Sequence, residues 1–190
     1  ILDIAERYPL KVFPDAVGLR PDGRENLLPY GSMVFNAFGA DNDIRAAAFE
    51  EGERVAAWIM DSCERHNLTT TGLGADIWKV ADEGRIEPQQ ATLLVRALLS
   101  AGVDTTIFGI GNTLYNLAKY PEQWEKLKAK PQLAKFAVDE ALRVESPFQM
   151  FHRTSTVDTE IGGVRIPADS KILLFMGAAN RDPRKWGEDA

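Results

Sequence analysis

The chain has 190 residues, of which 45% are hydrophobic and 26% are charged, a composition typical of a water-soluble globular protein. It excludes wholesale disorder, a collagen-like repeat and a disulfide scaffold. The formal net charge of -6 argues against nucleic-acid binding, because no excess of cations is available to displace counterions from phosphates. The single cysteine, Cys63, cannot form an internal disulfide, which favours a reducing compartment, the cytoplasm.

No run of about 20 apolar residues is present, since the best candidate, residues 92–117, is interrupted by Arg96, Asp104 and Asn112. We therefore expect no segment that crosses a bilayer and no membrane partner. The sequence begins with Ile1 rather than Met and stops at Ala190, so we expect an excerpt of a longer protein.

The first half of the chain predicts helices joined by short loops. Prolines and a Pro-Asp-Gly turn predict short helical pieces and bends up to about residue 28, followed by an apolar helix over 27–38. Cap residues at 41–43 precede an amphipathic helix over about 44–60. A loop over 68–74 then leads into a short helix over 75–82.

The longest predicted helix runs from about residue 87 to 120, with Pro88 at its first position, and would extend ~50 Å at 1.5 Å per residue. Helices over 121–130 and 132–144 follow. Apolar residues flanking Gly162-Gly163 then predict a β-hairpin, whereas the apolar segment 173–179 is compatible with a strand or a helix.

The segment Ala101-Gly102-Val103-Asp104-Thr105-Thr106 interrupts the apolar middle of the longest helix. A helical glycine costs up to ~1 kcal/mol relative to alanine, so the segment needs a reason. Gly102 could let a large flat group approach, while Thr105 diverts its hydroxyl and Asp104 passes protons inward from solvent. Alternatively, Gly102 packs where helices cross, Asp104 lies at the surface and both threonines bond to the preceding turn.

Two further groups of residues could carry a function. Glu140 and Arg143 share a helical face and can pair in a buried setting, or merely on a solvated surface. His152 and Arg153 precede the hairpin and could present cations to a carboxylate-bearing cofactor while Phe151 lines a cavity; a plain surface role is the alternative. No zinc motif is present.

The order of these motifs resembles a bacterial soluble cytochrome P450: Ala-Gly-x-Asp-Thr-Thr, Glu-x-x-Arg, His-Arg before a Gly-Gly hairpin, and Asn-Arg-Asp-Pro at 180–183. The resemblance covers nearly all of the chain and implies a mainly α fold with a long central helix and a small β-hairpin region. Residues 1–190 would form part of one P450 domain, comprising the roof helices, the distal helix, the acid-x-x-Arg helix and the hairpin. The N-terminal part and the haem-thiolate loop would lie outside the chain.

The resemblance also implies haem b as cofactor and a role for each motif. Asp104 and Thr105 would be catalytic and govern proton delivery to dioxygen, and Glu140 and Arg143 would support the structure. The residues implied to contact haem are Ala101, Gly102, His152 and Arg153. No Phe-x-x-Gly-x-x-x-Cys-x-Gly loop occurs and Cys63 lies among charged neighbours in a helix, so the chain supplies no iron ligand.

Within that family the chain looks most like the branch that oxidises para-substituted benzoates, including oxidative demethylation of methoxy groups. This implies an aromatic-acid substrate, O2, and electrons from a ferredoxin and its reductase. The residues implied to bind substrate are Phe35, Phe38, Arg96, Ala97, Ser100 and Phe151. Ala97 departs from the hydroxyl expected to hold a carboxylate, which leaves Ser100 and parts outside the chain to anchor it.

Three alternatives remain at this point. Phe35 and Phe38 could be simple core residues. The chain could come from a haem-free helical binding or scaffold protein with the same architecture, or from a P450 that acts on a terpene or another neutral ring.

Overall fold

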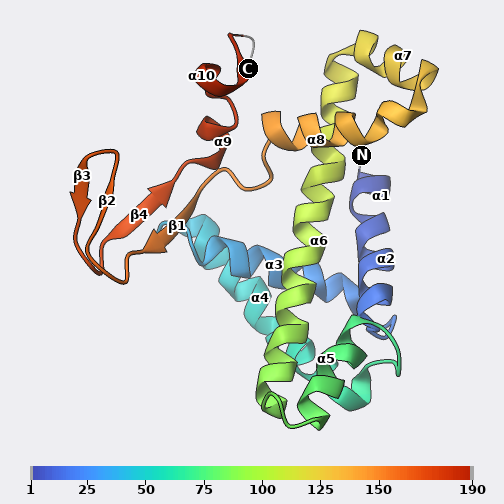
Figure 1. Ribbon diagram of the computed structural model, residues 1–190. Coiled ribbons are helices and arrows are strands. Elements are labelled where there is room, and N and C mark those ends of the chain that lie inside the picture. The colour runs from blue at the N-terminus through green and yellow to red at the C-terminus, as the bar shows by residue number, and fades with distance from the viewer. Residues whose placement is uncertain (1, 189–190) are drawn as a thin grey trace. The chain divides into compact units, whose positions relative to one another are not determined.

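The computed structural model describes residues 2–188, which form helices and two small antiparallel sheets (Figure 1). The chain divides into two compact units, Ile1–Phe108 and Gly109–Ala190, and the long helix α6 (Pro88–Lys119) continues from the first into the second. The mainly helical class is confirmed. The single partial domain over 1–190 stays a prediction.

The first unit consists of helices and short 3-10 turns. Apart from the beginning of α6, its elements are α1 (Leu2–Ala5), α2 (Arg7–Val17), η1 (Arg24–Asn26), α3 (Leu27–Asn36), α4 (Asp43–Ser62), η2 (Arg65–Asn67) and α5 (Leu73–Asp82). The predicted caps are confirmed, since the Asn42 side chain accepts a hydrogen bond of 3.0 Å from the backbone N–H of Arg45. Pro88 is the first residue of α6, as expected.

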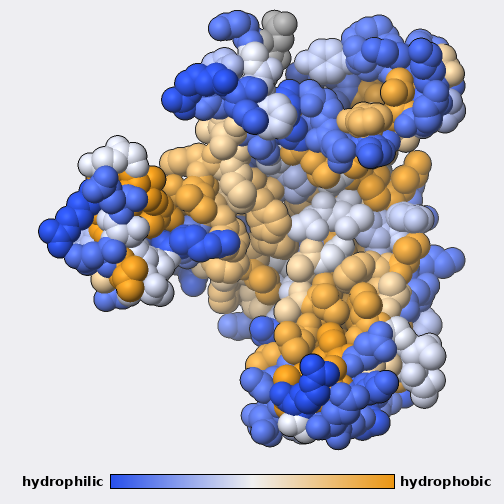
Figure 2. All heavy atoms as spheres, in the orientation of Figure 1, coloured by the Kyte–Doolittle hydropathy of each residue, from blue (hydrophilic) through white to orange (hydrophobic). Residues whose placement is uncertain are grey.

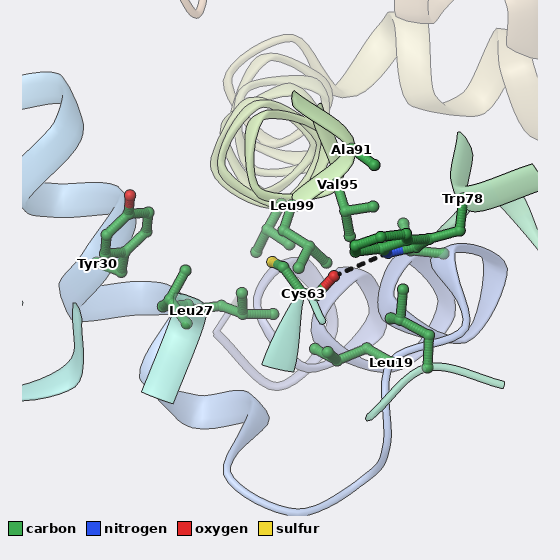
Figure 3. Close-up of a cluster of buried hydrophobic side chains, with 12 residues drawn as sticks. Leu19, Leu27, Tyr30, Cys63, Trp78, Ala91, Val95 and Leu99 are labelled. Atoms are coloured by element: carbon green, nitrogen blue, oxygen red, sulfur yellow. Dashed lines mark hydrogen bonds between the residues drawn. The ribbon is translucent and has the colours of Figure 1, made fainter. Parts of the chain in front are cut away.

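The core of the first unit gathers one face of α6 against α2, α3, α4 and α5. Every fourth residue of α6 from Ala91 to Val103 is buried, because this spacing keeps the side chains on one face. Figure 3 shows Val95 and Leu99 of this face beside Cys63, while Trp78 Nε1 donates a hydrogen bond of 3.1 Å to the Cys63 carbonyl. The buried residues of the cluster are Val17, Leu19, Leu27, Tyr30, Ile59, Cys63, Leu68, Trp78, Ala91, Val95, Leu99 and Val103.

By length and composition alone, α6 could cross a bilayer, with a mean hydropathy of 1.6 over its most apolar window. The sequence argument did not expect this because it required an unbroken apolar run. A core helix meets the same criteria, and α6 has a buried face in the first unit at Val95, Leu99 and Val103. The property is therefore weak evidence for a membrane segment.

The second unit combines the end of α6 with short helices and strands. These are α7 (Pro121–Ala129), η3 (Pro131–Leu133), α8 (Ala134–Val144), β1 (Phe151–Thr154), β2 (Thr159–Ile161), β3 (Val164–Ile166), β4 (Lys171–Leu174), α9 (Met176–Ala179) and α10 (Pro183–Trp186). The hairpin prediction is confirmed: β2 and β3 pair antiparallel across Gly162 and Gly163, whose φ angles of 58° and 80° suit glycine. Figure 2 shows hydrophobic atoms at the surface of the hairpin, where Ile161 and Val164 are exposed.

The other sheet was not predicted from the sequence. β1 and β4 pair antiparallel, with Phe151 opposite Leu174 and Thr154 opposite Lys171. The pattern around His152 shows no alternation strong enough to indicate a strand, because β1 depends on a partner some 20 residues later in the chain. The segment 173–179, for which the sequence allowed a strand or a helix, contains the end of one strand and a short helix: β4 ends at Leu174 and α9 begins at Met176.

Candidate functional site

The polar segment of α6 lies in the first unit, and both of its threonines bond to the preceding turn. Thr105 Oγ1 donates to the Ala101 carbonyl and Thr106 Oγ1 donates to the Gly102 carbonyl, each at 2.7 Å. Such bonds divert a hydroxyl proton into the helix and leave the oxygen lone pairs as acceptors. Thr105, which is half-buried, can therefore accept a hydrogen bond from water or from a ligand.

Gly102 accommodates a side chain of its own unit. A Cβ built at Gly102 would lie 2.6 Å from Cε2 of Phe13 on α2, and closer to Cζ of the same ring. This is the helix-packing role that the sequence left open. It corrects the expectation that the missing side chain of Gly102 leaves room for haem, since that space is occupied by Phe13.

The face of α6 opposite the buried stripe carries several of the expected site residues. Ala97, Ala101, Asp104 and Thr105 recur at helical spacing on this face, and both alanines are exposed. Small side chains leave the backbone of α6 accessible to a flat ligand at Ala101. The site residues of α6 therefore separate, with Gly102 toward the core and Ala101 away from it.

Asp104 differs from the alternative interpretation that placed it at the surface, because its side chain is half-buried. Burial raises the pKa of its carboxyl from 3.8 to about 6. No ion pair within residues 2–188 includes it. Loss of water therefore controls its proton affinity, and Asp104 exchanges a proton close to neutral pH.

The residues expected to bind substrate in the first unit are only partly suited to it. Phe35 lies half-buried on α3, whereas Phe38 follows the end of that helix and is 58% exposed. Ser100 Oγ donates a hydrogen bond of 3.1 Å to the Arg96 carbonyl. The hydroxyl would have to break this bond before it could donate to a substrate carboxylate. The positive charge of Arg96 lowers the pKa of the Cys63 thiol, so the Arg96 guanidinium lies near the core cluster.

In the second unit, Glu140 and Arg143 form the paired structure expected of them. Arg143 Nε and Nη2 donate to the two carboxylate oxygens of Glu140 at 2.8 and 2.7 Å, and Nη1 donates to the Asn180 carbonyl at 2.6 Å. The Arg143 side chain is only 12% exposed, while that of Glu140 is 59% exposed. The charged hydrogen bonds from Arg143 lower the pKa of Glu140. Arg143 thus fixes the segment after β4 to helix α8.

The Asn-Arg-Asp-Pro segment strengthens the same junction. Asn180 Nδ2 donates to Ser146 Oγ at 2.8 Å, and the Arg181 guanidinium donates twice to the Val144 carbonyl at 2.9 and 2.6 Å. The Trp186 ring lies 5.1 Å from the Arg143 guanidinium. These bonds support the scaffold role predicted for this segment.

A cavity of about 680 Å3 opens in the second unit between the end of α6, α7 and α8. Leu117, Leu127 and Phe136 contribute apolar walls, and Glu140 and Arg143 lie at its polar side. None of the expected catalytic or substrate residues lines it.

Phe151, His152 and Arg153 lie on β1. Successive residues of a strand point to opposite faces, which puts Phe151 and Arg153 on one face of β1. The Arg153 guanidinium lies 4.8 Å from the centre of the Phe151 ring, in agreement with this alternation. The His152 ring nevertheless lies beside the Phe151 ring, with ring centres 6.0 Å apart and ring planes 18° apart. Arg153 is exposed and has no carboxylate partner among the ion pairs of residues 2–188.

Cys63 is unsuited to bind iron. It follows the end of α4, is completely buried in the core cluster, and burial raises the pKa of its thiol to about 12. A thiolate is required for metal binding. This geometry agrees with the expectation that Cys63 does not serve as the iron ligand.

The structure thus brings Ala97, Ala101, Asp104 and Thr105 together on one face of α6. It separates Gly102 from them. Sequence reasoning missed Phe13, the neighbour of Gly102, because nothing in the local pattern of α2 indicates what it packs against.

The structure thus combines a mainly helical fold, a long helix with a polar Gly-x-Asp-Thr segment, and a Glu-x-x-Arg clamp whose arginine is largely buried. A family model described as "Cytochrome P450" matches residues 61–190. The chain is 51% identical over 188 residues to cytochrome p450 CYP199A2 of Rhodopseudomonas palustris, covering 99% of this chain and 46% of that relative. It is 30% identical over 196 residues to 6-deoxyerythronolide B hydroxylase of Saccharopolyspora erythraea, covering 98% and 47%.

Among solved structures, cytochrome P450 CREJ in complex with (4-ethylphenyl) dihydrogen phosphate matches with a TM-score of 0.81 and 29% identity, covering 96% of this chain and 46% of that one. The chain belongs to the cytochrome P450 family. It spans less than half the length of the curated relatives it matches.

Proposed function

We propose that the protein containing this chain is a cytoplasmic haem-thiolate monooxygenase that hydroxylates or oxidatively O-demethylates aromatic carboxylic acids such as 4-substituted benzoates. A ferredoxin and its reductase supply the electrons. The observation that carries the proposal is the face of α6 opposite its buried stripe, where the half-buried Asp104 and Thr105 lie beside the exposed Ala101 in a chain of this family.

The residues present fit haem b in two places. The small side chains of Ala97 and Ala101 leave an exposed strip of α6 that can lie against a flat ring. Arg153 projects a guanidinium without a carboxylate partner in the described part of the chain, and such a group can hold a propionate through two charged hydrogen bonds. Arg153 is the better of the two candidates because a guanidinium is always charged and binds a carboxylate through two hydrogen bonds, whereas the His152 ring is stacked against Phe151. When bound, haem supplies the iron that activates dioxygen.

Asp104 and Thr105 would control the proton that this chemistry consumes. The Thr105 hydroxyl is held by the Ala101 carbonyl, so its oxygen is oriented to accept a hydrogen bond. The Asp104 carboxyl, with a pKa of about 6, can take a proton from solvent and release it inward near neutral pH.

An aromatic acid is supported by two observations. Phe151 and Phe148 meet edge to face, with ring centres 6.0 Å apart, and form an aromatic wall next to Arg153 in the second unit. A structural relative at 29% identity was solved with (4-ethylphenyl) dihydrogen phosphate, which is also a para-substituted ring with an acidic group. Phe35 and Arg96 remain proposed contacts in the first unit.

The carbon monoxide difference spectrum of the reduced full-length protein tests the haem-thiolate part. We expect the red-shifted Soret band of a thiolate-bound haem, and the same band in the variant Cys63→Ser, because the buried Cys63 is not the ligand. A full-length protein that binds no haem would instead support a helical binding or scaffold protein.

Substrate binding spectra test the acid. 4-Methoxybenzoate should shift the haem spectrum more strongly than its neutral analogue 4-methoxytoluene or than camphor, and equal responses would refute the acid assignment.

The proton role is tested by Thr105→Ala, with Thr106→Ala as matched control because both hydroxyls make the same bond to the preceding turn. Thr105→Ala should release hydrogen peroxide in place of product while substrate binding persists. Thr106→Ala should keep product formation coupled to electron consumption. Equal coupling in both variants would contradict the role of Thr105.

A further inference from the structure

Helix α3 carries one glycine, Gly31, in its interior and buried from solvent. Glycine is disfavoured inside a helix relative to alanine, so its presence needs a reason. The backbone at Gly31 is helical and is not among the positive-φ glycines of the chain, so a conformation that only glycine adopts is not the reason. Space is the remaining explanation.

The space beside Gly31 is taken by the side chain of Asp104. A Cβ built at Gly31 would lie 2.8 Å from Cγ of Asp104 and closer still to Oδ2. Both residues belong to the first unit, and Leu27 and Tyr30 of α3 share a hydrophobic cluster with Leu99 and Val103 of α6. Figure 3 shows Leu27, Tyr30 and Leu99 in this cluster. The backbone of α3 therefore covers the carboxyl group that the proposed chemistry uses.

No positive charge within residues 2–188 offsets the loss of water around the Asp104 carboxyl. Tyr30 is the one ionisable residue of α3, and its side chain is buried in the core cluster. On α6 itself the charge nearest in sequence is that of Arg96, two turns away, which acts on Cys63. Cations of the neighbouring elements in this unit mostly pair elsewhere: Arg7 with Asp3, Arg24 with Asp15, Arg45 with Asp41, and Arg54 with Glu51. Lys11 of α2 is exposed and does not contribute to the raised pKa of Asp104.

We propose that Gly31 is a positioning residue for Asp104: its missing side chain lets α3 close over the Asp104 carboxyl and hold it away from water. An alanine at this position would push the carboxyl outward or lift α3. Burial is the only cause that raises the pKa of Asp104, in agreement with this arrangement. Gly31 would thus set the pH at which Asp104 exchanges its proton, without itself touching a reactant.

The functional readout rests on the proposed function, and it is the coupling of electron consumption to product in the full-length holoenzyme, measured from about pH 3.5 to about pH 8. We expect Gly31→Ala to move the midpoint of this profile by about one to two pH units toward acid, because a rehydrated carboxylate returns toward its ordinary pKa. In the Asp104→Asn background, Gly31→Ala should cause no further shift. An unmoved midpoint in Gly31→Ala, where Asp104→Asn does alter the profile, would overturn the proposal.

The matched control is Gly109→Ala, which makes the same change inside α6 with ordinary room, since the nearest atom is a Leu142 side-chain carbon at 3.4 Å. It should leave the midpoint unchanged, and a shift as large as that of Gly31→Ala would overturn the proposal.

A stability measurement separates this proposal from the proposed function. If Asp104→Asn leaves coupling unaltered, the proton role of Asp104 fails, and the pH dependence of Tm then decides the positioning role of Gly31. The Tm of the wild type should fall relative to that of Asp104→Asn as the pH rises from about 4 to about 6, and this relative fall should be absent when Gly31→Ala is compared with Gly31→Ala/Asp104→Asn. A relative fall that persists in Gly31→Ala would overturn the inference.

If Gly31→Ala does not yield a folded holoenzyme, the comparison moves to Asp104→Ala and the double variant Gly31→Ala/Asp104→Ala. Removal of the Asp104 carboxyl frees the space, so equal Tm values of these two variants support the inference. A markedly lower Tm of the double variant overturns it, because Gly31 would then be required by some other neighbour.

Discussion

The packing of Gly102 against Phe13 makes a quantitative prediction that separates two roles for a glycine in α6. In Gly102→Ala the new methyl group would overlap the Phe13 ring, and overpacking of this kind costs about 1–3 kcal/mol. The gain in helix propensity from glycine to alanine offsets up to about 1 kcal/mol of that. We therefore expect Gly102→Ala to lower the free energy of unfolding by up to about 3 kcal/mol.

A double-mutant cycle isolates this contact. In the Phe13→Ala background the ring is gone, so Gly102→Ala should be stabilising by up to about 1 kcal/mol. The coupling energy between the two positions is then about 1–3 kcal/mol. Urea denaturation of the full-length protein, followed by circular dichroism, gives the shift of the midpoint in each variant.

The haem spectrum completes the test. Because the methyl group at position 102 faces α2, the haem content and the carbon monoxide spectrum of Gly102→Ala should match those of the wild type. If Gly102→Ala were equally destabilising in both backgrounds, or if it lost haem while the fold stayed intact, the argument that Phe13 fills this space would be refuted.

Three further predictions concern stability and reactivity. Arg143→Ala should lower the free energy of unfolding by about 2–4 kcal/mol, because it leaves the Asn180 carbonyl without its hydrogen-bond donor. Glu140→Gln should lower it by about 1 kcal/mol or less, because the Glu140 side chain is exposed. Equal losses of the two variants in urea denaturation would contradict this. The pKa of Asp104 is raised, so the folded state retains a proton that the unfolded chain releases above its ordinary pKa of 3.8, and stability falls as pH rises through this range to about 6. Asp104→Asn should consequently raise Tm at pH values above about 6 and not below about 4, and a uniform change in Tm would argue against it. Cys63 should be unreactive toward a thiol reagent in the folded protein at mildly alkaline pH, since burial raises its pKa to about 12, and fast labelling without unfolding would show that the thiol is accessible.

The sequence by itself determined most of the secondary structure. Proline positions and cap residues mark where helices begin, as at Pro88, Pro121 and Asn42, because these effects act within one turn of the chain. The Gly162-Gly163 hairpin was likewise readable, since its turn requires positive φ at two adjacent residues. The Glu-x-x-Arg pair was readable as well, because residues three apart share a helical face.

Only the tertiary structure decided which way the glycines and acids of the site face. The sequence left open whether Gly102 admits a ligand or another helix, and Phe13, some 90 residues earlier, supplied the answer. It gave no sign that α3 covers Asp104 at Gly31, or that β1 would pair with β4. Local patterns fix backbone conformation through interactions within a few residues, whereas burial, pKa and strand pairing depend on segments that only the folded chain brings together.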